Sequence, residues 1–196
     1  MALQIWHRVL LRNRGIPYDY ILDNLPPVRI PIFVDASSSW GLGGVHGSRY
    51  FAVSHQQLRP FMCRCPGWGL YPLVPIAWLE LLAALIAIRV FTVRFPGHIW
   101  YLYSDKESVV AWLTSRRSPH PIVGTVVAAI EKIKYQLLLK ISARYISSGR
   151  NHVADRLSRN RIPRHLRTVG SSILPDLNDL AKAVNYNKLL ALWSLP

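Results

Sequence analysis

Four acidic side chains stand out because the chain has few of them. Its 196 residues include 10 Asp and Glu against 24 Lys and Arg, which gives a formal net charge of +14. The four lie in apolar or motif-like surroundings: Asp35, Glu80, Asp105 and Asp155. Carboxylates placed at the ends of otherwise apolar elements suit the binding of hard divalent cations such as Mg²⁺ or Mn²⁺. We therefore expect these residues to act together.

Each of these residues also has an ordinary explanation when it is taken alone. Asp35 after a strand can be a turn residue, Glu80 can favour the start of its helix, and Asp105 can cap the next helix. Their order within the pattern of strands and helices is more specific than any single residue. A cluster of them would repel itself. Two cations ~3.5–4 Å apart would relieve the repulsion and could promote attack of water on a phosphodiester.

The basic composition points to a polyanionic partner. A net charge of +14 favours nucleic acid first and an acidic membrane surface second, with a merely soluble basic surface as the plain alternative. The stretch 73–93 is apolar, but Glu80 and Arg89 interrupt it, so we expect a buried helix and no membrane partner. Cys63 and Cys65 fit neither a disulfide framework nor a four-ligand zinc site, which agrees with an intracellular protein of the cytoplasm or nucleus.

The elements that must position the carboxylates follow from hydrophobic pattern and turn residues. Strands are expected at residues 30–34, 41–46, 49–54, 99–104 and 141–146. Helices are expected at residues 77–93, 106–114, 123–138 and 151–158. The segment 55–76 is rich in Pro, Gly and aromatic residues, which predicts a loop. This order predicts an α/β fold with a mixed sheet, in which three antiparallel strands come first and helical crossovers add the others.

This arrangement predicts where the carboxylates meet. If the first and fourth strands are neighbours, Asp35 and Asp105 stand side by side at one edge of the sheet. Glu80, expected in the first turn of its helix, reaches that edge if the helix packs on the sheet. Ser104 or Asp105 is the expected N-cap of the helix at 106–114, and Asn151 is the expected cap of the last helix.

Four sequence blocks carry a pattern that is specific in combination. They are residues 33–37 with 40–44 (FVDAS and WGLGG), 79–84 (LELLAA), 104–105 with 108–111 (SD and SVVA), and 151–159 (NHVADRLSR). Together they resemble the ribonuclease H domain of reverse transcriptases, particularly those of DIRS-type retroelements and hepadnaviruses. The resemblance covers residues 30–160, expected as the RNase H-like domain.

The resemblance implies both a fold and a function. The implied fold is RNase H-like, a five-stranded mixed sheet flanked by helices. The implied activity is hydrolysis of the RNA strand of an RNA–DNA hybrid, with two Mg²⁺ or Mn²⁺ ions bound by Asp35, Glu80, Asp105 and Asp155. The polymerase portion of a reverse transcriptase is an implied partner. Residues 1–29 would then be a leader left from a polymerase connection region, and residues 161–196 form a basic tail with an amphipathic helix.

A second group of residues is expected near the substrate. These are Ser37, Lys106, Arg116, Arg117, Asn151 and Arg156. Arg116 and Arg117 are adjacent basic residues that suit contact with a phosphate, although a solvated loop would account for them equally well. Ser37 could contact the backbone of a hybrid or simply belong to a polar turn. Lys106 departs from the family pattern, which often has Asn at this place, and a cation there could weaken metal binding or contact a phosphate.

Two other functions fit parts of the pattern. A catalytically inactive RNase H-like module that binds nucleic acid is motivated by Lys106, and metal binding distinguishes it from the nuclease. A DDE-type transposase or integrase shares the carboxylate-bearing sheet. Its third acidic residue normally follows the second on a later helix, however, so Glu80 between Asp35 and Asp105 favours RNase H. No Ser-His-Asp order, Walker loop or dinucleotide fingerprint stands out.

Overall fold

The structure, a computed structural model, describes most of the expected domain. It covers residues 29–62, 76–92, 98–117 and 121–169. Predictions for the leader (residues 1–28), for the two cysteines and for the amphipathic helix of the tail lie outside these ranges.

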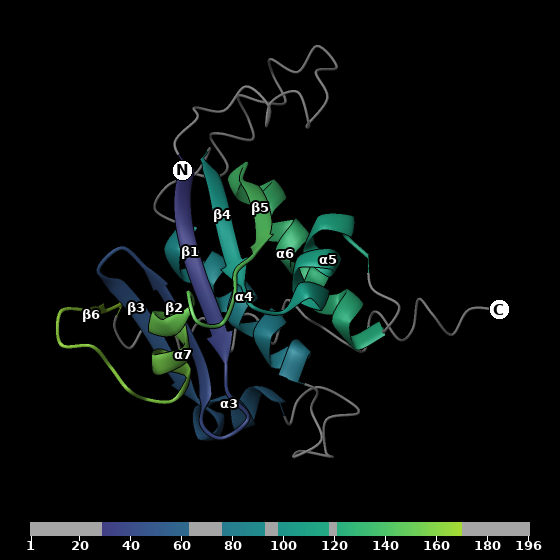
Figure 1. The fold of residues 1–196 in the computed structure, drawn as a ribbon. Coiled ribbons are helices and arrows are strands. Elements are labelled where there is room, and N and C mark those ends of the chain that lie inside the picture. The colour runs from purple at the N-terminus through teal and green to yellow at the C-terminus, as the bar shows by residue number, and fades with distance from the viewer. Residues whose placement is uncertain (1–28, 63–75, 93–97, 118–120, 170–196) are drawn as a thin grey trace, which may run out of the picture.

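A mixed sheet of six strands forms the centre of the described chain, in the order β5-β4-β1-β2-β3-β6 (Figure 1). The strands are β1 (Arg29–Ala36), β2 (Gly41–His46), β3 (Arg49–Ser54), β4 (Ile99–Ser104), β5 (Lys140–Tyr145) and β6 (Arg167–Thr168). The first three form an antiparallel meander, β4 runs parallel to β1, and β5 runs parallel to β4. The predicted mixed sheet is thus confirmed, including the adjacency of the first and fourth strands, but it has six strands where five were predicted.

Strand β6 was not predicted. Its two residues pair in parallel with the start of β3, so that Arg49 lies opposite Arg167 and Tyr50 opposite Thr168. They fall in the segment interpreted from the sequence as the beginning of a basic tail. A strand of two residues carries too little hydrophobic pattern to be recognised.

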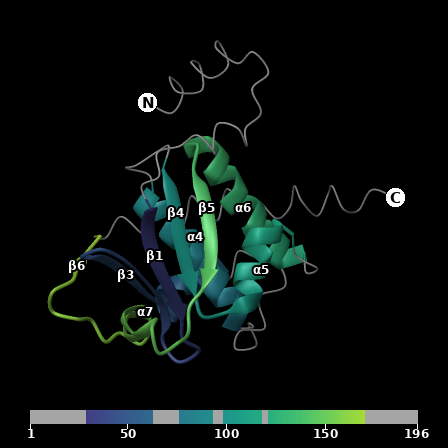
Figure 2. The ribbon, with the colours of Figure 1, turned by 45° about the horizontal axis from the view of Figure 1, so that its top comes forward.

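Five helices are described, and they cover the sheet on both faces (Figures 1 and 2). They are α3 (His55–Met62), α4 (Ile76–Thr92), α5 (Glu107–Ser115), α6 (Pro121–Leu137) and α7 (His152–Ser158). Helix α4 packs against β1 and β2 and is itself covered by α5 and α6, whereas α7 packs against β1, β2 and β3 from the other face. None of the described helices is long and apolar enough to cross a membrane.

Helix α4 is the centre of the hydrophobic core. It is apolar around nearly its whole circumference, and every side chain from Trp78 to Ile88 is buried. A helix of this composition is stable only when other elements surround it. One consequence matters for the site: Glu80, on this helix, is carried into the interior.

The expected loop at 55–76 was wrong for its first part, where α3 forms. Ser54 caps this helix, since the Gln57 backbone N–H donates to Ser54 Oγ at 3.2 Å. The Ser54 backbone N–H in turn donates to Gln57 Oε1 at 2.9 Å. This reciprocal pair is a capping box, which is encoded by Ser followed three residues later by Gln. Leu58, fully buried, anchors the helix to the core.

Candidate metal centre

Asp35 stands at the end of β1, opposite Gly43 of β2. Its side chain is 4% exposed, and its Oδ2 accepts a hydrogen bond of 2.5 Å from Ser158 Oγ of α7. Burial raises the pKa of Asp35 to about 7, with smaller contributions from the negative charges of Asp105 and Asp155, while the Ser158 hydrogen bond opposes the shift. This carboxylate is therefore costly to ionise in the absence of a cation.

Glu80 approaches the same place from α4. Its side chain is 1% exposed, and Oε1 accepts a hydrogen bond of 2.9 Å from the backbone N–H of Ala36, directly after Asp35. Burial, followed by the charge of Asp35, raises the pKa of Glu80 to about 9. Helix α4 begins at Ile76 and has no acidic residue in its first turn, so the expected position of Glu80 in that turn was wrong.

Asp105 follows the last residue of β4. Its Oδ2 accepts a hydrogen bond of 2.6 Å from Ser148 Oγ, whereas its Oδ1 is buried and has no hydrogen-bond partner among the described residues. The N-cap of α5 is Lys106, without a side-chain hydrogen bond, so the predicted capping by Ser104 or Asp105 was wrong. The Asp105 carboxylate is turned to Ser148 and the other carboxylates instead.

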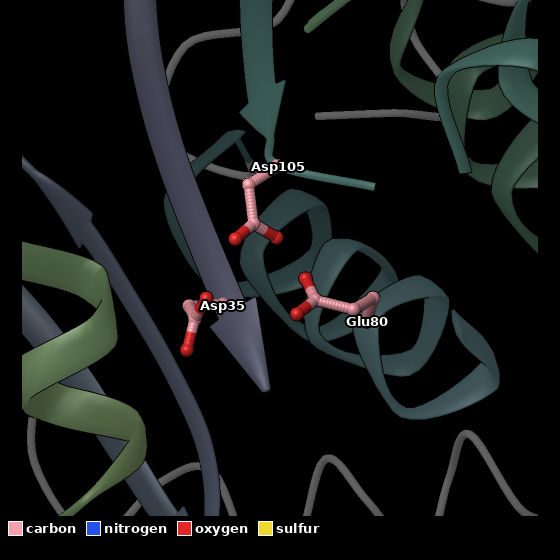
Figure 3. Close-up of side chains that lie close together, drawn as sticks. All are labelled: Asp35, Glu80 and Asp105. Atoms are coloured by element: carbon pink, nitrogen blue, oxygen red, sulfur yellow. The ribbon is translucent and has the colours of Figure 1, made fainter. Parts of the chain in front are cut away.

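The structure brings three of the four predicted carboxylates together. One oxygen from each of Asp35, Glu80 and Asp105 lies within 4.8 Å of the others. Figure 3 shows them around the carboxyl end of β1, with Asp105 from the end of β4 and Glu80 from α4. The ligand atoms are all oxygen, and one of them, Asp105 Oδ1, is buried without a partner in the part of the chain that the structure describes. Three carboxylates this close together also need neutralisation. These features fit a hard divalent cation such as Mg²⁺ or Mn²⁺.

Asp155 lies near this cluster but is not one of the three. It lines the same pocket, of about 300 Å³, as Asp35, Glu80 and Asp105. Its Oδ1 accepts a hydrogen bond of 2.8 Å from Arg159 Nε, four residues further along the chain. Asp155, the fourth predicted ligand, is therefore paired with Arg159 at the end of the same helix.

The residues expected near a substrate are placed in different ways. Ser37 and Lys106 line the pocket. Arg116, Arg117 and Arg156 are exposed outside its lining. Arg116 Nε lies 3.8 Å from Glu131 Oε2 of α6.

Asn151 is turned inward rather than toward solvent. It occupies the N-cap position of α7 as expected, but its side chain makes no capping hydrogen bond. It is 1% exposed, and its Nδ2 donates a hydrogen bond of 2.8 Å to the carbonyl of Val34. Its side chain therefore ties α7 to β1.

Sequence reasoning missed three residues that shape the centre. Ser158 and Ser148 hold the two aspartates, and Arg159 holds Asp155. A partial signal was present for two of them, because Ser158 and Arg159 follow Asp155 by three and four residues and so share its helix face. No such signal exists for Ser148, which lies in the loop between β5 and α7.

Comparison with known proteins identifies the fold. No family model and no curated protein matches the sequence. Among solved structures, the N-terminal RNase H domain of Rv2228c from Mycobacterium tuberculosis, solved as a fusion with maltose-binding protein, is similar. It has 14% identity and a TM-score of 0.50, over 69% of this chain and 100% of that one.

Two further structures show a weaker similarity. RNase H1 from the halophilic archaeon Halobacterium salinarum NRC-1 has 14% identity and a TM-score of 0.49, over 68% of this chain and 97% of that one. LC11-RNase H1, isolated from compost, has 18% identity and a TM-score of 0.47, over 68% and 95%. The sheet order and the similarity to the mycobacterial domain show that the chain has an RNase H-like fold, as predicted.

Proposed function

We propose that this chain is a metal-dependent endonuclease that hydrolyses the RNA strand of RNA–DNA hybrids. The observation that carries the proposal is the cluster of Asp35, Glu80 and Asp105, with oxygens within 4.8 Å at one sheet edge of an RNase H-like fold. The net charge of +14 supports a nucleic-acid substrate.

The residues that line the pocket have separate roles in this proposal. Asp35, Glu80 and Asp105 hold the cations, and Asp155, which lines the same pocket, is the proposed fourth ligand. Two bound Mg²⁺ or Mn²⁺ ions would supply Lewis-acid stabilisation of the phosphate and activation of water. Lys106 and Arg159 also line the pocket and offer positive charge to the flanking phosphates.

Preference for RNA would come from contacts to the 2′-hydroxyl and from the shape of the hybrid. Ser37 and Ser38 lie in the pocket directly after β1, where their polar groups can meet the sugar next to the cleaved bond. Arg116 and Arg117, exposed after α5, are the proposed contacts to a more distant phosphate.

A panel of labelled substrates tests the proposal. The chain is incubated with an RNA–DNA hybrid, duplex RNA, single-stranded RNA and duplex DNA, with Mg²⁺, with Mn²⁺ or with chelator. Of these substrates, we expect only the hybrid to be cut, in its RNA strand, and only when a divalent metal is present. Cleavage of duplex DNA would instead favour the transposase or integrase alternative, and an intact hybrid with both metals would contradict the nuclease.

A second candidate, an inactive module that binds nucleic acid, is favoured by one observation. Two cations, Lys106 and Arg159, line the pocket that would hold the metal, and Arg159 already pairs with Asp155. In this alternative the chain binds a hybrid equally well with and without divalent metal and does not cut it. Calorimetric titration with Mn²⁺ separates the two, since the inactive module would give no binding heat.

We further propose that the chain derives from the reverse transcriptase of a retroelement, with its polymerase portion as partner. The block at 151–159 and the segments around Asp35, Glu80 and Asp105 support this origin through their resemblance to such enzymes. Sequencing the transcript that encodes the chain tests it. A polymerase reading frame fused to or adjoining this one is the expected result, and its absence would argue against the origin.

A further inference from the structure

Helix α7 is fastened to β1 at both of its ends. At its start, Asn151 Nδ2 donates to the carbonyl of Val34 at 2.8 Å. At its last residue, Ser158 Oγ donates to Asp35 Oδ2 at 2.5 Å. The two acceptors are neighbours on β1, so the seven-residue helix spans the strand end that carries the first carboxylate.

Gly43 lets the helix approach this closely. It lies opposite Asp35 in the register of β1 and β2. A Cβ atom at Gly43 would lie 2.5 Å from the Ser158 nitrogen and 2.6 Å from Leu157 Cβ, distances that packed atoms do not tolerate. The missing side chain thus sets the distance at which Ser158 reaches Asp35.

The Ser158 hydroxyl has two acceptors within reach but only one hydrogen. The Asp35 carboxylate lies at 2.5 Å and the carbonyl of Asp155, in its own helix, at 2.9 Å. When Asp35 is ionised, as it must be to bind a cation, a bond from the hydroxyl to its carboxylate is shorter and roughly twice as strong as one to a neutral acceptor. The hydrogen is therefore directed to Asp35, and the carbonyl of Asp155 is the weaker alternative.

The second aspartate of the cluster is held in the same way. Ser148 Oγ donates to Asp105 Oδ2 at 2.6 Å, and the other oxygen, Oδ1, is buried and has no partner in the described ranges. For Asp35, Ser158 is the only donor to the carboxylate among the described residues. Each aspartate thus has one oxygen fixed by a serine and one left for another ligand.

We propose that Ser158 is a positioning residue, which fixes Asp35 Oδ2 so that the carboxylate presents its other oxygen to a divalent cation. The inference rests on the proposed metal site. Groups that hydrogen-bond to metal ligands restrict ligand orientation, and their loss typically weakens metal binding by ~10–100-fold. Ser158 is fully buried, so solvent cannot replace its hydroxyl.

Binding of Mn²⁺ to the full chain without nucleic acid tests the inference. Free Mn²⁺ is followed by its electron paramagnetic resonance signal, and folding is monitored by circular dichroism. Ser158→Ala is expected to raise the dissociation constant for Mn²⁺ by ~10-fold or more. Ser158→Cys, which replaces the hydroxyl by a slightly larger thiol that is a weak donor, is expected to weaken binding in the same direction.

Ser115→Ala is the matched control. Ser115 Oγ donates to the carbonyl of Trp112, three residues back in α5, as Ser158 can to Asp155, but among the described residues it donates to no carboxylate. Its removal should leave Mn²⁺ binding unchanged.

The outcomes separate this inference from the proposed function. Folded Ser158 variants that bind Mn²⁺ as tightly as the unaltered chain would overturn the inference and leave the nuclease standing. The inference would also fail if both variants unfolded, since the hydroxyl would then be structural. An unaltered chain without affinity for Mn²⁺ would overturn both, whereas one that binds Mn²⁺ without cutting a hybrid would overturn only the nuclease.

Discussion

Glu80 Oε1 accepts a hydrogen bond of 2.9 Å from the backbone N–H of Ala36, across 44 residues of sequence. This bond joins the buried helix α4 to β1 at the residue that follows Asp35. It places a second carboxylate beside Asp35, and within the described part of the chain no cationic side chain is hydrogen-bonded to either. The buried carboxylates therefore lower the free energy of unfolding of the metal-free chain, and this loss can be measured.

Glu80→Gln is expected to stabilise the metal-free chain at pH 8. The amide oxygen can still accept from Ala36, but the side chain no longer has to bind a proton, or bury a charge, when the chain folds. We expect a gain in the free energy of unfolding on the order of 1–3 kcal/mol, measured by urea denaturation in chelator. At pH 4, where Glu80 is largely protonated in the unfolded chain as well as in the folded one, the gain should vanish. Equal stability of both chains at pH 8 would contradict the buried placement of this charge.

The metal-free chain is expected to lose stability as the pH rises. Burial raises the pKa of Asp35 from 3.8 to about 7 and that of Glu80 from 4.5 to about 9. Both groups bind their protons more tightly in the folded chain than in the unfolded chain. The stability that results is fully present at low pH and is lost as the pH rises toward the raised pKa values. Each carboxyl contributes a slope of up to ~1.4 kcal/mol per pH unit. The fall should be steeper below pH 7, where both groups contribute, than between pH 7 and 9.

Divalent metal should reverse this loss. A cation that binds only the folded chain stabilises it by mass action, by ~2.7 kcal/mol at a concentration 100 times the dissociation constant. We expect Mg²⁺ or Mn²⁺ to raise the midpoint of urea denaturation at pH 8 and to have little effect at pH 4. A stabilisation of the same size at both pH values would indicate binding elsewhere.

Gly43→Ala is expected to destabilise the chain and disturb the centre. The added methyl group would collide with α7, which costs ~1–3 kcal/mol when packed elements must shift. Gly124→Ala, in α6, is the matched control, since nothing lies within 4 Å of a Cβ at that position. Alanine favours a helix interior over glycine, so this control should gain ~0.5–1 kcal/mol. If the two substitutions gave the same change, the close approach of α7 to β2 would be wrong.

Lys106→Gln is expected to strengthen metal binding. Lys106 lines the pocket, and its positive charge works against the raised pKa of Glu80. A charge at ~4 Å is worth ~1 kcal/mol in a solvated setting, so Mn²⁺ affinity should rise several-fold. Lys132→Gln, an exposed change of equal charge on α6, should have little effect. Unchanged affinity in Lys106→Gln would show that this cation does not oppose the metal.

The sheet could be predicted from the sequence because its signals are local. The β-branched and aromatic run before Asp35 predicts β1, and Gly47 with Ser48 predicts the turn of the following hairpin, where Gly47 adopts a φ of +56°. Helix α3 was also locally encoded, through Ser54 and Gln57, but the surrounding Pro and Gly residues obscured that signal.

The carboxylates of the candidate site could be predicted from the sequence, but the residues that surround them could not. The order of Asp35, Glu80 and Asp105 on strand, helix and strand was enough to place them at one edge. The hydrogen bond between Ser158 and Asp35 joins residues 123 positions apart. It also depends on the absence of a side chain at Gly43, and no local sequence pattern reveals this. The ion pair of Asp155 with Arg159 was missed, although their spacing of four residues on one helix is a signal for it.

The most direct measurement compares the unaltered chain with Asp105→Asn in cleavage of a hybrid labelled in its RNA strand. Initial rates are followed as Mn²⁺ is titrated from chelator to saturation. Asp105 supplies a buried oxygen that has no hydrogen-bond partner among the residues described. The neutral amide side chain of the variant cannot replace this charged ligand. We predict metal-dependent cleavage by the unaltered chain and a loss of at least ~100-fold in the variant. Equal rates in the two chains, or cleavage that persists in chelator, would contradict the metal centre.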